Sequence, residues 1–255
     1  MQRSDADALR RVVLAHGFTQ TARSWEVFER LLRTHQPDLE TMAVDLPGHG
    51  DAPPPADADL WSSAGRLVDV GGVGTYVGYS MGGRVALHAA LAAPDAVHRL
   101  VLIGATAGID DDDERQARLE ADDRLADHIE VVGVPAFIDE WLANPLFSGL
   151  TEGAALRSDR LRNTSAGLSA SLRATGTGTQ TPLWDRLGEV ECPALVLVGE
   201  HDEKFTELGR RLVAAQPDAE LVIVPDAGHS VHLEQPEATA ACVATWLLRP
   251  ERCAR

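Results

Sequence analysis

Residues 75–90 read TYVGYSMGGRVALHAA, a short β-prone run that meets a turn of small residues and continues as an apolar helix. At the join, Gly78-Tyr-Ser-Met-Gly82 matches the G-x-S-x-G nucleophile elbow. A serine on so sharp a strand-to-helix turn needs neighbours without a Cβ, because side chains there would collide with adjacent backbone. The turn would hold Ser80 Oγ at a helix N-terminus, where free N–H groups stabilise a developing anion. The motif predicts a serine nucleophile, if a base and an acid follow along the chain.

Apolar runs typical of buried parallel strands recur on both sides of this elbow. They alternate with segments of helical character that begin near residues 24, 60, 82, 206 and 237. Such alternation predicts an α/β fold, a mostly parallel sheet with right-handed crossovers and flanking helices. The expected strands cover residues 12–15, 42–44, 75–77, 100–103, 194–198 and 221–224.

The alternation stops between residues 109 and 182, where charged helical stretches replace the strands. We expect a helical cap over 109–182, inserted in a core formed by residues 1–108 and 183–255. Its helices are predicted over residues 111–131, 134–143 and 150–175. The acidic run Asp110-Asp-Asp-Asp-Glu114 is interpreted as a solvated helix N-terminus rather than a metal site, because carboxylates favour that end of the helix dipole.

Composition excludes several classes of protein. With 255 residues, 44% of them hydrophobic, the chain can form one large globular domain with an inserted subdomain. A formal net charge of −16 argues against nucleic acid or an anionic membrane as partner, since both require a basic surface. No apolar run approaches the roughly 18 residues that a membrane helix needs. Whether the chain is a monomer or a homo-oligomer is left open.

Cysteine usage and the first residues predict a location and the absence of cofactors. Three cysteines, Cys192, Cys242 and Cys253, form no dense framework, and their odd number predicts free thiols in a reducing compartment. Residues 1–7 contain no apolar leader, so a cytoplasmic location is expected. There is no Gly-rich phosphate loop and no His or Cys cluster with metal-ligand spacing, which predicts neither cofactor nor metal.

Two later strand ends supply the partners that Ser80 needs, because open α/β sheets bind ligands beyond the carboxyl ends of their strands. One expected strand is followed by Gly199-Glu-His-Asp202 and the last by Pro225-Asp-Ala-Gly-His229. Ser80, Asp202 and His229 thus occur in the order nucleophile, acid, base. His229 would take the proton of Ser80, and Asp202 would orient the imidazole. The oxyanion hole would consist of the backbone N–H groups of Phe18 and Met81.

Other titratable residues near these positions have alternative interpretations. Asp226 also follows a strand and is the alternative acid, although it lies only three residues before His229. His16 is expected to shape the oxyanion turn rather than to act as a base. Structural or solvated roles are expected for the remaining candidates, His49, His88, His232, Glu200 and Glu203.

A particular set of segments extends beyond these general motifs: residues 16–18, 78–84, 114–118, 140–147, 160–163 and 228–236. Over essentially its whole length the chain resembles the α/β-hydrolase superfamily. More narrowly, these segments are similar to the MenH family, the 2-succinyl-6-hydroxy-2,4-cyclohexadiene-1-carboxylate synthases of menaquinone biosynthesis. The cap segments carry the narrower resemblance, since many hydrolases share the others.

The resemblance implies an elimination rather than a hydrolysis. Enzymes of that family remove pyruvate from a cyclohexene that bears several carboxylates, so a small anionic substrate is implied. Ser80 and His229 would abstract a proton, and the oxyanion hole would hold enolate-like charge. The substrate-binding residues that match the family are Tyr79, Arg84, Arg118, Trp141 and Arg162.

Each of these residues also has a simpler interpretation. Arg84 lies one helical turn after Ser80 and would face the pocket, or would pair with a surface carboxylate. Arg118 follows Glu114 by four residues and would make a helix salt bridge. Lys204 would reach the pocket or only solvate its loop, and Trp141 would pack inside the cap. The neighbours with which Arg162 can be confused are Arg157, Arg160 and Arg173.

Two other functions fit the same fold. A carboxylesterase or C–C bond hydrolase would use the same three residues on an ester or ketone, but a neutral substrate would favour an apolar lining over inward arginines. A receptor without turnover would keep the fold alone. A haloalkane dehalogenase is disfavoured, since it would need an aspartate at position 80.

Overall fold

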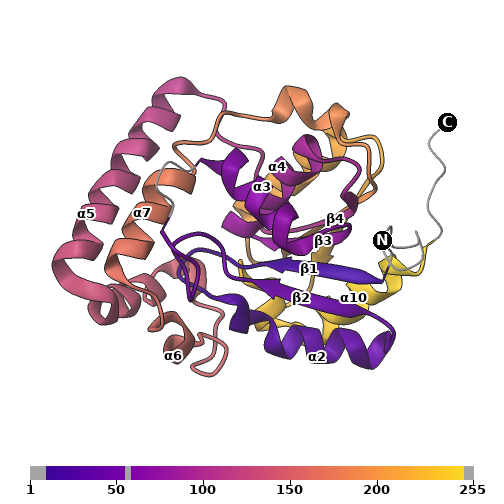
Figure 1. Cartoon of the computed structure of the whole chain (residues 1–255), viewed down its shortest axis with the longest axis horizontal. Helices are drawn as coiled ribbons and strands as arrows, with labels where there is room; N and C mark the ends of the chain where they lie inside the picture. Colours follow the sequence, from indigo (N-terminus) through magenta and orange to yellow (C-terminus); the bar gives the residue numbers. More distant parts are fainter. Residues whose placement is uncertain (1–9, 55–58, 250–255) are drawn as a thin grey trace.

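Six parallel strands form the centre of the molecule (Figure 1). The structure, a computed structural model, describes residues 10–54 and 59–249. The strand order is β2-β1-β3-β4-β5-β6, and each neighbouring pair is parallel. The chain therefore runs outward from β1 to one edge and then back across the sheet to the other. The strands are β1 (Arg11–Ala15), β2 (Glu40–Val44), β3 (Gly74–Tyr79), β4 (Val97–Ile103), β5 (Ala194–Gly199) and β6 (Ala219–Val224).

Helices cover both faces of the sheet because the strand residues are apolar on both sides. Val13 and Ala15 point toward α3 (Leu60–Gly71), α4 (Met81–Ala92) and α8 (Glu203–Ala215). Val12 and Leu14 point to the opposite core, formed with α2 (Glu26–His35) and α10 (Pro236–Leu247). Figure 1 shows α3 and α4 on one side of the sheet and α2 and α10 on the other. Short turns complete the described elements: η1 (Ala22–Trp25), η3 (Trp184–Glu189) and α9 (Val231–Glu234).

The segment between β4 and β5 is helical and lies beyond one end of the sheet, where α5 and α7 stand side by side in Figure 1. It contains α5 (Asp112–Leu142), η2 (Pro145–Phe147), α6 (Arg157–Arg160) and α7 (Ser165–Thr175). A separate apolar cluster holds α5 and α7 together, and Phe18 from the loop after β1 packs against it. Gly133 interrupts α5 with φ 78° and ψ 161°. The bounds expected for the cap, 109–182, stay a prediction.

The predicted α/β fold is confirmed, with all six expected strands present. The helical stretch expected over 150–175 is not continuous. The chain forms α6, turns, and then forms α7, whose start Thr164 caps by accepting a hydrogen bond from the Gly167 N–H. Such a side-chain cap competes with continued helix. The start of β4 was also missed, because Val97-His-Arg is not a continuous apolar run.

The cysteines and the helices bear on two expectations from composition, free thiols and the lack of a membrane helix. Cys192 and Cys242 are free thiols, and Cys253 lies outside the described residues. Across residues 10–54 and 59–249, none of the helices combines the length and the apolar character needed to cross a membrane.

The elbow between β3 and α4 is built from very close backbone contacts. Ser80 has φ 51° and ψ −109°, and its N–H donates to the carbonyl of Ile103 on β4 at 2.8 Å. A Cβ on Gly82 would lie 2.1 Å from the carbonyl oxygen of Ala15, and one on Gly78 would lie 2.3 Å from that of Gly82. Only glycine fits at these two positions, which explains the G-x-S-x-G spacing.

Gly82→Ala should lower the free energy of unfolding by about 3 kcal/mol or more, because the clash is with backbone that cannot rotate away. Gly65→Ala, inside α3, is the matched control, since a Cβ there meets nothing within 4 Å. It should raise the free energy of unfolding by about 0.5–1 kcal/mol. Urea denaturation of both variants measures the difference, and equal effects would contradict this account of the elbow.

Candidate active site

Ser80, His229 and Asp202 form a hydrogen-bonded line and follow the carboxyl ends of β3, β6 and β5, respectively. The Ser80 Oγ lies 3.4 Å from His229 Nε2, and Asp202 Oδ2 lies 2.7 Å from His229 Nδ1. His229 and Asp202 are 2% and 8% exposed, whereas Ser80 is half-buried and faces a cavity. The other carboxylate oxygen of Asp202 accepts the N–H of Phe205, which fixes the acid at the start of α8. This arrangement can move a proton from Ser80 to His229.

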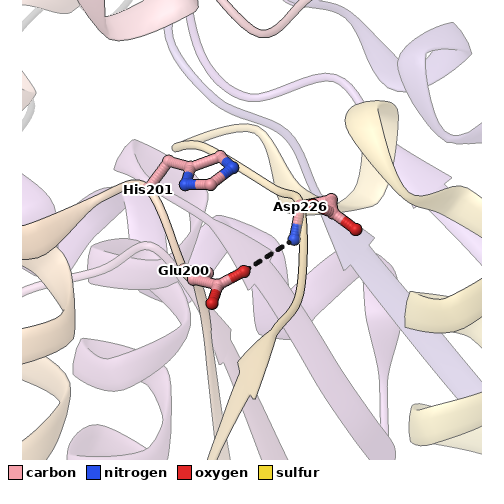
Figure 2. Close-up of side chains that lie close together, drawn as sticks. All are labelled: Glu200, His201 and Asp226. Carbon is pink, nitrogen blue, oxygen red and sulfur yellow. Dashed lines mark hydrogen bonds between the residues drawn. The ribbon is translucent and has the colours of Figure 1, made fainter.

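Asp226, the alternative acid, does not contact His229, whose Nδ1 is taken by Asp202. Figure 2 shows Asp226 beside Glu200 and His201, and a carboxylate oxygen of Asp226, one of Glu200 and a ring nitrogen of His201 lie within 4.8 Å of one another. Glu200 Oε2 accepts the backbone N–H of Asp226 at 3.1 Å. All three side chains are exposed, which fits the solvated role expected for Glu200.

The two expected oxyanion donors, the backbone N–H groups of Phe18 and Met81, belong to residues that line the same cavity as Ser80. In the described part of the chain, neither the Phe18 nor the Met81 N–H donates to a protein acceptor. The Gly17 carbonyl, which shares a peptide bond with the Phe18 N–H, accepts hydrogen bonds from His16 Nδ1 at 2.8 Å and from the Gln20 N–H at 3.1 Å. The Leu46 N–H donates to His16 Nε2, so the proton of this neutral ring stays on Nδ1. His16 thus holds the turn that carries the Phe18 N–H, and the role of this turn as an oxyanion hole stays a prediction.

A cavity of about 210 Å³ opens in front of Ser80. Four cationic side chains and no carboxylate line it, although the formal net charge of the chain is −16. The rest of the wall is mainly aromatic and apolar. The lining residues are Phe18, Tyr79, Ser80, Met81, Arg84, Arg118, Trp141, Leu146, Phe147, Arg160, Leu172, Thr175, Gly176, Thr177, Lys204, Phe205 and His229.

Four of the five expected substrate-binding residues line this cavity, namely Tyr79, Arg84, Arg118 and Trp141. The Tyr79 hydroxyl is hydrogen-bonded to Ser230 Oγ at 2.8 Å. The Trp141 Nε1 is buried and has no hydrogen-bond partner among the described residues. The Arg118 Nε donates to Asp122 Oδ1 at 2.8 Å, which orients its guanidinium.

Arg162, the fifth expected residue, is not part of the cavity wall and instead forms an ion pair with Asp51 at 3.5 Å. Arg160, two residues earlier, lines the cavity. It is only 1% exposed, and its Nη2 has no hydrogen-bond partner among the described residues. The sequence could not separate these two arginines, because α6 is only four residues long and has no periodicity to read.

Burial lowers the pKa of two of these guanidinium groups. For Arg84 it lowers the pKa to about 10, and the nearby charge of Arg118 adds to the effect. Burial likewise lowers the pKa of Arg160 to about 10. Neither forms an ion pair with a carboxylate in the described part of the chain. Both groups still carry their charge near neutral pH, and the charges of Asp122 near Arg84 and Asp159 near Arg160 only partly offset the effect of burial.

Comparison with known proteins fits this geometry. The model of the alpha/beta hydrolase family matches residues 12–242. The chain belongs to the alpha/beta hydrolase family. Proteins named 2-succinyl-6-hydroxy-2,4-cyclohexadiene-1-carboxylate synthase are 34% identical in Enterobacter sp. (strain 638), over 91% of this chain and 90% of that protein, and 32% identical in Serratia proteamaculans (strain 568), over 94% and 93%.

Two solved structures of alpha/beta hydrolase shape extend the comparison. MenH from S. aureus superposes with a TM-score of 0.86 at 27% identity and covers 96% of both chains. A thermophilic esterase from Thermogutta terrifontis, described as malate bound, superposes with a TM-score of 0.77 at 25% identity, over 93% of this chain and 89% of that one. The chain is thus similar in sequence to the synthases and in shape to both a MenH protein and an esterase.

Four buried histidines predict that the protein loses stability in acid. Burial is the main cause that lowers the pKa of each, to about 4 for His88 and about 3 for His232, and also for His16 and His49. Below the ordinary pKa of 6.5 the unfolded chain binds more protons than the folded one, so the free energy of unfolding falls as pH drops from about 6.5 toward the folded-state values. Each histidine contributes up to about 1.4 kcal/mol per pH unit.

Urea denaturation between about pH 7.5 and pH 4.5 measures this fall. His232→Phe is the informative variant, since neither ring nitrogen of His232 has a hydrogen-bond partner within residues 10–54 and 59–249 and its ring packs between Trp25 and Tyr79. The variant should take up one proton fewer on unfolding in acid, so its free energy of unfolding should depend less steeply on pH. The same slope in both proteins would contradict the assignment.

Proposed function

We propose that this chain is a carbon–oxygen lyase of the 2-succinyl-6-hydroxy-2,4-cyclohexadiene-1-carboxylate synthase type, which eliminates pyruvate from a cyclohexene bearing several carboxylates. One observation carries the proposal: a cavity with four cationic side chains and no carboxylate in its wall opens onto Ser80. The similarity to synthases of that name supports it. On this proposal the chain takes part in menaquinone biosynthesis.

The charges of the cavity fit a polycarboxylate better than a neutral molecule. Arg84 and Arg160 are buried and carry no carboxylate partner in the described part of the chain. A buried charge without a partner is costly, and guanidinium groups bind carboxylates through paired hydrogen bonds. Arg118 and the exposed Lys204 add charge to the same wall. A substrate with several carboxylates would supply the missing anions.

The reaction would begin with transfer of the Ser80 proton to His229, helped by the Asp202 carboxylate at His229 Nδ1. Ser80 Oγ would then take a proton from the ring carbon of the substrate. The electron pair would shift into a carbonyl, whose developing negative charge faces the Phe18 and Met81 N–H groups. Its return would form the new ring double bond and break the carbon–oxygen bond, and the departing enolpyruvate would take up the proton held by His229 to become pyruvate. Here Ser80 acts as a base and forms no covalent intermediate.

An ester hydrolase with anionic substrates is the second candidate. The Ser80, His229 and Asp202 geometry would equally support attack of Ser80 Oγ on a carbonyl. The similar shape of an esterase described as malate bound favours this candidate, because malate is a dicarboxylate. The two candidates share the cavity and differ in what Ser80 does.

A paired assay separates them. Purified protein should release pyruvate from the cyclohexene tricarboxylate, and turnover should fall by at least about 1,000-fold in Ser80→Ala, because the proton acceptor is lost. Hydrolysis of p-nitrophenyl esters with and without a free carboxylate is followed beside it. Ester turnover that depends on Ser80, with no pyruvate, would refute the lyase and favour the hydrolase.

A matched pair of variants tests which arginine binds the substrate. Arg160→Gln should raise KM for the anionic substrate by roughly 10- to 100-fold, because a buried charge-assisted contact contributes about 1.5–3 kcal/mol. Arg162→Gln should change KM by less than about threefold, since Arg162 already pairs with exposed Asp51. The reverse ranking would restore Arg162 as the substrate-binding residue that the sequence indicated.

A further inference from the structure

Glu234, which the reaction above does not use, holds the loop that carries His229 from both sides. Its Oε2 accepts the N–H of Gly228 at 2.7 Å, and its Oε1 accepts the N–H of Ser230 at 2.9 Å. One carboxylate therefore binds the two residues that flank His229. Hydrogen bonds to an ionised acceptor are about twice as strong as neutral ones, so this double contact is a firm one.

Fixing the backbone on both sides of His229 fixes the direction in which its side chain leaves the chain. That direction matters because one imidazole must meet Asp202 at 2.7 Å and Ser80 at 3.4 Å at the same time. The ring is also confined laterally: the centroid of Phe205 lies 4.4 Å away, and a Cβ on Gly104 would lie 3.0 Å from His229 Cε1. A small rotation of the loop would lengthen the contact with Ser80, which is already the longer of the two.

The same carboxylate touches the helical segment above the sheet. A Cβ on Gly149 would lie 2.0 Å from Glu234 Oε2. Gly149 is exposed and follows η2, which ends at the cavity-lining Phe147. Glu234 thus lies at the junction between the His229 loop and one wall of the cavity.

We infer that Glu234 is a positioning residue that sets His229 at its working distance from Ser80 and affects the reaction only through His229. The inference rests on the role proposed above for Ser80 and His229. Replacement by glutamine keeps the size of the side chain but turns an NH₂ group toward one of the two backbone N–H donors, which breaks half of the contact.

The reactivity of Ser80 toward a fluorophosphonate probe tests this inference without the substrate. In that reaction Ser80 Oγ forms a bond to phosphorus, fluoride leaves, and His229 takes the serine proton. Labelling should slow by roughly 10- to 100-fold in Glu234→Gln, as expected when a reacting group is displaced by about 1 Å. Glu237→Gln is the matched control, because it removes the same charge from an exposed position three residues later. Its labelling rate should stay within about twofold of the parent rate.

A second variant guards against loss of folding in the first. Gly149→Ala leaves the carboxylate in place but adds a methyl group where Glu234 Oε2 lies, and it should slow labelling several-fold. The low-field proton signal of His229 Nδ1 should shift in both variants and not in Glu237→Gln. Parent-like labelling in whichever of the two variants folds would overturn the inference.

The experiment also separates this inference from the proposed function. If the parent protein labels well but releases no pyruvate, and Glu234→Gln labels slowly, the lyase is refuted and Glu234 is still the positioning residue. Pyruvate release that is unaffected by Glu234→Gln would overturn the inference and leave the lyase.

Discussion

The close approach of the Gly82 backbone to the carbonyl of Ala15 is the constraint on which the rest of the site depends. It brings the ends of β1 and β3 together, and Ser80 then adopts a left-handed conformation that a non-glycine residue adopts only at some cost. The bond from the Ser80 N–H to Ile103 ties the turn to β4. A Cβ on Gly17 would lie 2.6 Å from the Tyr79 ring, so the oxyanion loop is positioned by the same packing. The proposed nucleophile and the expected oxyanion donors are therefore positioned by the same packing.

Charge is distributed so that a strongly acidic chain can keep a cationic cavity. Arg173 on α7 pairs with carboxylates on the outer face of α5, including Glu130 at 3.2 Å and Asp127. These pairs are exposed and contribute little to stability. Their effect is to leave acidic groups outside, while Arg84 and Arg160 lie inside, where the low dielectric strengthens their attraction for an anion. The field at Ser80 is thus local and opposite in sign to the net charge.

The fold and the line from Ser80 to Asp202 could be predicted because each strand contains an apolar run and each of the three residues lies shortly after the end of a strand. Arg160 could not be distinguished from Arg162, since a four-residue helix carries no periodic signal. The role of Glu234 could not be predicted for a different reason. Its carboxylate binds backbone N–H groups, which every residue except proline has, so its partners leave no pattern in the sequence.

The same three residues would serve either an elimination or an ester hydrolysis, so selectivity must arise from the state of the cavity before reaction. Arg84 and Arg160 bear the cost of burial without a carboxylate partner in the described part of the chain. An anionic ligand offsets that cost and stabilises the folded protein by mass action, whereas a neutral ester leaves the two charges unpaired. The preference for an anionic ligand would therefore already exist in the protein before a ligand binds, and on the proposed function Ser80 would act only on molecules that the two arginines have bound.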